Sequence, residues 1–287
     1  MLAGFVIFLR EGTEASIIVA VLLSYLDRAG HRREFKAIFL GAGIAGFLAA
    51  AGGVAAYLTI RTYAGSRVQT IFETVTYGVA VIVLTYMTFW MRAHAKTISK
   101  ELARKAESAI GKKEKWGLGL LAFQAVGREG LETAVFTLAI VFAAGAAQTL
   151  IGGLFGLIAA LGVAYAIFRA GKRLNLSAFF TTVGTLLIVF AAGLVADFVE
   201  NLQGLGWVHA LHGQLWNTTG FMSENSAIGD VFHSLFGYAD RPTALQAVCY
   251  LVYVASAVGI YIALNRRTTA RAVRSSQKRT GLDASPT

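Results

Sequence analysis

Two five-residue segments place opposite charges inside apolar stretches of the chain. Residues 10–14 read Arg-Glu-Gly-Thr-Glu and residues 128–132 read Arg-Glu-Gly-Leu-Glu. A helix turns by about 100° per residue, so the arginine and both glutamates of a segment project from one face. Each segment carries two negative charges and one positive charge, so the two segments together lack two positive charges. We expect a bound cation to supply them.

The glutamates indicate which cation would bind. Carboxylate oxygens are ligands for hard cations, and four converging carboxylates make an all-oxygen site. The segments contain no cysteine and the chain has only four methionines, which disfavours Cu(I), whereas Fe(III) suits clustered carboxylates. The arginines are expected to keep the glutamates ionised and oriented. The predicted ligands are Glu11, Glu14, Glu129 and Glu132, with Arg10 and Arg128 as electrostatic partners.

The surrounding sequence predicts membrane-spanning helices. The chain has 287 residues, of which 56% are hydrophobic and 15% charged, against about 25% charged residues in soluble domains. Seven apolar runs are long enough to cross a bilayer. They cover residues 2–26, 37–60, 74–91, 116–143, 148–168, 177–196 and 244–264. We therefore predict an all-α integral membrane protein; the single Cys249 excludes an intrachain disulfide framework.

Both charged segments fall near the middle of their apolar runs, where a charge is most costly. Six unpaired charges at that depth would cost roughly 15–20 kcal/mol, so they must be paired, solvated or both. The plainest alternative is a pair of buried Arg–Glu contacts that lock two helices and never meet an ion. Duplication at matching depth, with an excess of negative charge, favours a site.

The basic residues of the connections predict the orientation of the chain. Twenty-one lysines and arginines flank one side of the seven runs and three flank the other, which predicts an external N-terminus and a cytoplasmic C-terminus. We expect one transmembrane domain over residues 1–264, with an external loop at 201–243, and a disordered basic tail at 265–287. The net charge of +10 is thus a topology signal, and nucleic acid is not an expected partner.

The spacing of the charged segments predicts an internal repeat. They lie 118 residues apart, and each opens a group of three runs, about 2–91 and about 116–196. An odd number of spans inverts the second group relative to the first, so both segments meet near the midplane, with 244–264 as an added helix. Gly12 and Gly130 are expected to let the two charged helices approach closely. Small-residue seams are predicted on the second helix of each group, at Gly41, Ala45, Ala49, Gly152 and Gly156.

Acidic residues at helix ends form a weaker signal. Glu73, Asp197 and Glu200 are predicted to face outside, where they either collect cations at an outer mouth or are ordinary solvated acids. His209, His212 and His233 fall in the external loop; their spacing leaves metal capture and simple surface roles open. Trp90 is interpreted as an interfacial anchor.

The paired Arg-Glu-Gly-x-Glu segments of a seven-span chain resemble the oxidase-dependent iron transporters, the high-affinity iron permeases of bacteria and fungi. The resemblance covers nearly the whole chain and implies that Glu11, Glu14, Glu129 and Glu132 bind iron. It implies import across the plasma membrane or bacterial inner membrane, commonly with an extracytoplasmic iron-oxidising partner. Related members are implicated in lead uptake.

Other functions fit the sequence less well. A retinal protein would need a lysine within 244–264, and no Glu-x-x-His or His-Glu-x-x-His segment supports an enzyme. The serious alternative is a proton-coupled carrier or channel for lead, manganese or zinc, or for an anion. We expect a transporter rather than an enzyme, with no prosthetic group and iron as the transported substrate. The oligomeric state is left open.

Overall fold

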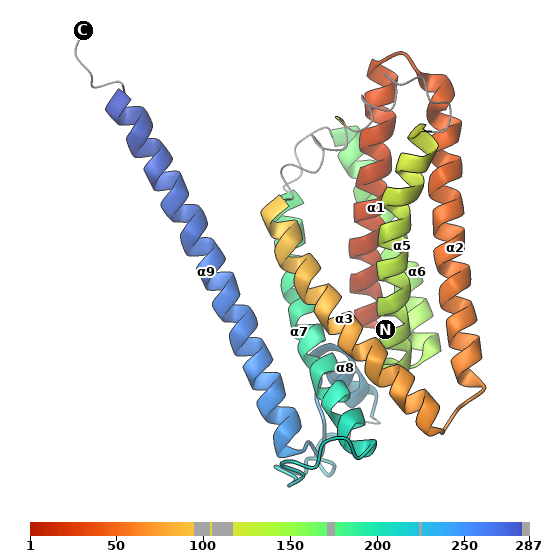
Figure 1. Ribbon diagram of the computed structural model, residues 1–287, viewed down its shortest axis with the longest axis vertical. Helices are drawn as coiled ribbons and strands as arrows, with labels where there is room; N and C mark the ends of the chain where they lie inside the picture. The colour runs from red at the N-terminus through yellow and green to blue at the C-terminus, as the bar shows by residue number, and fades with distance from the viewer. Residues whose placement is uncertain (95–103, 105–116, 171–175, 224–225, 283–287) are drawn as a thin grey trace.

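The computed structural model describes residues 1–94, 104, 117–170, 176–223 and 226–282. Within these residues it contains eight α-helices, a 3-10 helix at Arg32–Glu34 and no strand, which confirms the all-α prediction. Each of the seven predicted apolar runs coincides with a long helix (Figure 1). The helices are α1 (Leu2–Arg28), α2 (Phe35–Arg61), α3 (Arg67–His94), α5 (Gly117–Ala144), α6 (Ala146–Ala170), α7 (Leu176–Gly204), α8 (Ala227–Phe236) and α9 (Ala244–Leu282).

Five of these helices are long and apolar enough to cross a membrane: α2, α3, α6, α7 and α9. Their outward faces are apolar as well, since Phe47 on α2 is 72% exposed and Ile82 on α3 is 69% exposed. A chain that leaves such side chains uncovered on several helices fits a lipid environment better than water. The helices α1 and α5 are not among the five, and they carry the two charged segments.

The helices pack in pairs that link the two halves of the chain. The most extensive contacts join α1 to α6, α2 to α5, and α3 to α7, while α1 and α5 also touch each other. In Figure 1, α1, α2, α5 and α6 form one group, and α9 leans away from the bundle. The small-residue seams predicted on α2 and α6 are present. A Cβ on Gly41 would collide with the carbonyl oxygen of Gly119, and one on Gly152 with that of Met1.

The prediction that Gly12 and Gly130 let the two charged helices approach each other is wrong, because each glycine contacts a different helix. A Cβ on Gly12 would lie 2.9 Å from Cβ of Ala160 on α6, and a Cβ on Gly130 would lie 2.8 Å from Cβ of Ala49 on α2. Each glycine thus faces the second helix of the other half, and not the other charged helix. The reason is helical phase, because the residue two after each arginine points about 200° away from it.

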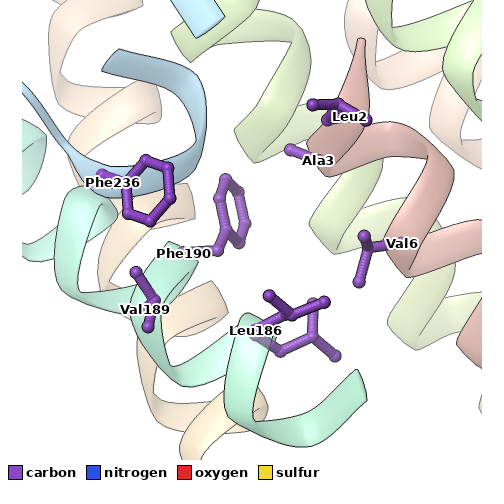
Figure 2. A pocket seen from close by; sticks show the side chains of 8 residues that line it. Leu2, Ala3, Val6, Leu186, Val189, Phe190 and Phe236 are labelled. Atoms are coloured by element: carbon purple, nitrogen blue, oxygen red, sulfur yellow. The ribbon is translucent and has the colours of Figure 1, made fainter. Parts of the chain in front are cut away.

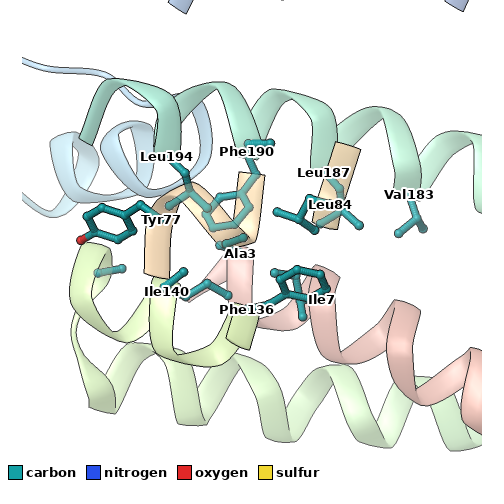
Figure 3. Close-up of a cluster of buried hydrophobic side chains, with 14 residues drawn as sticks. Ala3, Ile7, Tyr77, Leu84, Phe136, Ile140, Val183, Leu187, Phe190 and Leu194 are labelled. Atoms are coloured by element: carbon teal, nitrogen blue, oxygen red, sulfur yellow. The ribbon is translucent and has the colours of Figure 1, made fainter. Parts of the chain in front are cut away.

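Apolar clusters lie on both sides of the charged segments along the bundle axis. On one side, α1, α3, α5 and α7 bury a cluster that includes Ile7, Leu84 and Phe136 (Figure 3). On the other side, α1, α2 and α5 bury a second cluster that includes Leu22 and Leu118. Along the bundle axis, the charged segments therefore lie between two clusters of apolar side chains.

An apolar pocket lies beside the bundle, between the start of α1, the middle of α7 and the end of α8 (Figure 2). Its lining is entirely hydrocarbon, so it offers no ligand to an ion. The lining residues are Leu2, Ala3, Val6, Leu186, Leu187, Val189, Phe190 and Phe236.

The C-terminal segment differs from the expected disordered tail. α9 runs on to Leu282, through most of residues 265–287, whereas 283–287 lie outside the described residues. Arginine and alanine recur in this stretch and favour helix, so an apolar helix extends easily into it. The predicted external loop also contains a helix, α8, which Ser226 caps by accepting a hydrogen bond from the Gly229 amide.

Candidate metal centre

Three glutamates from the two charged segments meet inside the bundle. One carboxylate oxygen from each of Glu11, Glu14 and Glu129 lies within 4.8 Å of the others, and all three residues are buried. Oxygens bound to one cation at about 2.1 Å lie at most about 4.2 Å apart. A small side-chain adjustment is therefore enough for the three to hold one ion. Helices α1 and α5, 118 residues apart in sequence, thus bring their charged faces together.

Arg10 is the cation of the first segment, and it is fully enclosed. Its Nη1 lies 3.0 Å from Oε1 of Glu11 and its Nε lies 3.0 Å from Oε1 of Glu14. The arginine is 2% exposed. The predicted sharing of one face by arginine and both glutamates is what allows this double contact. Arg10 thereby orients two of the three converging carboxylates.

The second segment is arranged differently, although its sequence pattern is the same. Nε of Arg128 lies 3.0 Å from Oε1 of Glu132, and the two side chains are 45% and 12% exposed. Glu132 is outside the group of three, although its sequence position matches that of Glu14. The structure thus brings together three of the four predicted ligands and holds the fourth beside them in an ion pair.

Polar atoms of the charged segments are left without hydrogen bonds. Among the described residues, the buried side-chain atoms with neither a hydrogen bond nor an ion-pair contact include four from these two segments: Arg10 Nη2, Glu11 Oε2, Glu129 Oε2 and Glu132 Oε2. Buried polar atoms are rarely left so, because each costs about 1–3 kcal/mol. The four glutamates and two arginines also sum to two negative charges. Both features fit a site that receives a cation.

The predicted outer acids lie near one another at one end of α3 and α7. The carboxylates of Glu73, Asp197 and Glu200 all interact electrostatically with the buried Tyr77. Figure 3 shows the hydroxyl of Tyr77 pointing away from the apolar cluster. Two of these acids accept hydrogen bonds from glutamines: Gln69 Nε2 donates to Glu73 at 2.7 Å and Gln246 Nε2 donates to Glu200 at 3.0 Å.

The histidines of the external loop have separate surroundings. His209 and His212 are exposed, and their rings stack with centroids 6.2 Å apart outside any helix. His233 on α8 is half-buried, with Nε2 3.9 Å from Oδ1 of Asp197. Within the described residues, none of these histidines joins a group of three metal-binding side chains.

Two residues beside the site were not predicted from sequence. Nη2 of Arg128 donates to Sδ of Met87 at 2.8 Å, and its Cζ lies 5.2 Å from the ring centroid of Trp90. Both residues are on α3, three positions apart. The sequence analysis interpreted Trp90 only as an interfacial anchor. A methionine and a tryptophan one turn apart in an apolar helix do not reveal which neighbouring helix they face.

The chain is similar to proteins of one known family. The profile of the iron permease FTR1 family matches residues 1–275. Ferrous iron permease EfeU of Yersinia pestis is 31% identical over 280 residues, which cover 97% of this chain and 99% of the relative. Ferrous iron permease EfeU of Escherichia coli O157:H7 is 30% identical over 277 residues, which cover 96% of this chain and all of the relative. No solved structure matches the chain.

The match extends over almost the full length of the chain and of its relatives, and it includes both charged helices. Iron uptake, inferred from the charged segments, agrees with the family description, and a permease is a transporter rather than an enzyme. The chain belongs to the iron permease FTR1 family and is a multi-pass membrane transporter for iron.

Proposed function

We propose that the protein imports iron by binding it to Glu11, Glu14 and Glu129 between α1 and α5. The observation that carries this proposal is the buried convergence of three carboxylates within 4.8 Å in a cluster whose arginines leave two negative charges uncompensated. A buried anionic cluster is costly without a counter-ion, and in a carrier the transported metal is that counter-ion. Arg10 holds the carboxylates of Glu11 and Glu14 in place in the empty site.

We propose further that α1 and α5 also cross the membrane, which gives seven spans. They have 27 and 28 residues, or about 40 Å at 1.5 Å per residue, and their mid-helix charges are directed at each other. Two inverted repeats, α1–α3 and α5–α7, are supported by the matching pairs α1 with α6 and α2 with α5. The paired contacts of Gly12 and Gly130 support the same symmetry. Rocking of one repeat against the other would alternate access to the site.

The orientation that we propose has the N-terminus outside and the C-terminus in the cytoplasm, in the plasma membrane or a bacterial inner membrane. Glu73, Asp197 and Glu200 then lie at the outer end of the bundle. There they raise the local concentration of cations before an ion enters the site. The distribution of basic residues in the connections supports this orientation.

We propose Fe(III) as the ion in the glutamate site. The relatives are named ferrous iron permeases, which by itself favours Fe(II); we propose that an extracytoplasmic partner oxidises Fe(II) to Fe(III) before the ion binds. All-carboxylate ligation supports the trivalent ion, because harder cations bind oxygen ligands more strongly.

Uptake by the purified protein in liposomes tests the proposal. Fe(II) supplied with an oxidant should enter wild-type liposomes and Fe(II) kept reduced should not, and Glu11→Gln or Glu129→Gln should abolish entry while the protein stays folded in the membrane. Asp27→Asn, which changes an acid at the exposed end of α1, is the matched control and should transport normally. Near-normal uptake by either glutamate variant would overturn the ligand assignment. Preferred uptake of lead, manganese or zinc, or an anion current without metal, would overturn the choice of iron.

A further inference from the structure

The two arginines of the charged segments have matching sequence positions but different freedom to move. Arg10 is 2% exposed and contacts two buried glutamates. Arg128 is 45% exposed and forms its ion pair with Glu132. Removing Arg10 from its partners would leave two buried carboxylates without a cation, whereas removing Arg128 would leave one, Glu132. Arg128 is therefore the less constrained of the two arginines.

A fixed pair of side chains on α3 holds the guanidinium of Arg128. Sδ of Met87 accepts a hydrogen bond from Nη2 at 2.8 Å, and the ring of Trp90 lies 5.2 Å from Cζ. We call Met87 and Trp90 the α3 seat. Met87 is 1% exposed and packs with Met91 and Phe180, so the seat is held in place by the bundle. Aromatic faces and sulfur atoms both attract a guanidinium.

Arg128 stands on the accessible side of the carboxylates. The residues Glu11, Glu14 and Glu129 are 2%, 5% and 6% exposed, while the Glu132 side chain is 12% exposed and that of Arg128 45%. Apolar clusters close the bundle above and below the charged segments. Glu132 and Arg128 therefore form the least enclosed side of the glutamate cluster.

The two carboxylate oxygens of Glu132 have different surroundings. Its Oε1 contacts Arg128, while its Oε2 is buried without a hydrogen bond. If Arg128 withdraws, Glu132 is free to join the other three glutamates. Four carboxylates with Arg10 then carry three negative charges, which is the charge balanced by one Fe(III) ion. With Arg128 in place the deficit is only two.

We propose that Arg128 is a gating cation, which covers the glutamate site when it is empty and leaves Glu132 when iron binds. This inference rests on the proposed function of the site. The α3 seat stabilises the closed position of Arg128, so Met87 and Trp90 are positioning residues that set the affinity for iron.

Fluorescence of Trp90 reports directly on the gate. A variant that keeps Trp90 and replaces the other three tryptophans by phenylalanine is placed in lipid nanodiscs and titrated with ferric citrate, and in parallel with Fe(II) under ascorbate. Withdrawal of the guanidinium should shift the emission maximum at saturation, and bound iron is counted independently by mass spectrometry. The same background with Arg128→Gln should bind iron without a shift. Equal shifts in both backgrounds, or binding without any shift, would overturn the gate.

Measurements of iron affinity in variants of the α3 seat distinguish a gating role from structural damage, because the two predict opposite changes in affinity. Trp90→Leu removes the cation–π contact and weakens the closed state, so iron should bind about threefold more tightly. Trp90→Phe keeps a ring face and should stay closer to wild type, and Met87→Leu keeps the packing volume while removing the sulfur acceptor, so it should also tighten binding. A merely structural role predicts weaker binding in all three variants, and that result would overturn the proposal.

The outcomes also distinguish this inference from the proposed function. If the wild-type protein binds no iron by mass spectrometry, the glutamate site itself is wrong. If it binds iron but Trp90 does not respond and Trp90→Leu binds more weakly, the glutamate site stands and the gate fails.

Discussion

Nε of Arg10 lies 3.0 Å from Oε1 of Glu14, one helical turn further along α1, and the two side chains are 2% and 4% exposed. The equivalent pair on α5, Arg128 and Glu132, has the same separation but is 45% and 12% exposed. The two ion pairs thus have equal N–O distances but different exposure, so breaking them should cost different amounts of free energy. Arg10 is enclosed by protein together with two carboxylates, whereas Arg128 is only partly enclosed and pairs with one carboxylate.

We therefore expect the two arginines to differ in their contribution to stability. Arg10→Gln leaves two buried carboxylates without a cation and should cost about 3–5 kcal/mol of folding free energy. Arg128→Gln should cost less, because it leaves one carboxylate without its cation instead of two. Thermal unfolding of both variants in the same detergent measures the difference. Equal losses of stability would contradict the asymmetry.

The glutamates of α5 should also differ when each is changed to glutamine. Glu129 belongs to the buried group of three, and loss of the charge of one ligand should weaken iron binding by more than about a hundredfold. Glu132→Gln leaves that group intact and removes only the carboxylate that joins it after Arg128 withdraws, so it should weaken binding less than Glu129→Gln. The two positions lie one turn apart on one helix, so each variant controls for the other. Direct iron-binding measurements in nanodiscs would refute this ranking if Glu132→Gln proved the more damaging.

The close contact of Gly130 with Ala49 makes a testable prediction about helix packing. A Cβ on Gly130 would lie 2.8 Å from Cβ of Ala49, so Gly130→Ala should force α2 and α5 apart and cost about 1–3 kcal/mol. Adding Ala49→Gly removes the colliding atom and should restore most of the loss. A double-mutant cycle in thermal unfolding measures this coupling. Gly46→Ala on α2, where a Cβ meets nothing within 4 Å, should be tolerated.

Sequence reasoning located the helices and the meeting of the charged segments because both depend on strong local signals. Apolar runs of bilayer length predict helices, and a charge within such a run must find a partner. Convergence of α1 and α5 followed from the repeat. The seams at Gly41 and Gly152 were predicted for a related reason, since small residues mark close helix contacts.

The sequence did not predict which residues of different helices contact each other across the bundle. The partners of Gly12 and Gly130 depend on the rotation of each helix about its axis, which an apolar surface on nearly all sides does not define. The same uncertainty concealed the contact between Arg128 and the α3 seat. It also made the two charged segments look equivalent, because their difference arises from what α3 presents to α5 and not from the segments themselves.

The outer acids should affect the capture of iron and not its binding at the centre. Neutralising Asp197 or Glu73 to the amide removes a charge at the outer end of the bundle, so uptake at low iron should fall about threefold while the maximal rate is preserved. Rising salt should reduce the effect, because screening weakens surface attraction. Initial uptake rates at several iron concentrations separate KM from the maximal rate. A lower maximal rate with an unchanged KM would argue against a role in capture.

Cysteine labelling tests whether α2 and α5 cross the membrane and in which direction. In a Cys249→Ala background, single cysteines replace Arg33 and Ala64, which flank α2, and Arg104 and Ala147, which flank α5; all four positions are exposed. An impermeant maleimide added to intact cells should label Ala64→Cys and Ala147→Cys. The other two cysteines should react only after the membrane is permeabilised, because their side carries most of the basic residues. Since α5 contains three charged residues at mid-depth, its crossing is the sharper test: labelling of Arg104→Cys and Ala147→Cys from the same side would remove α5, and with it the midplane glutamate site, from the membrane.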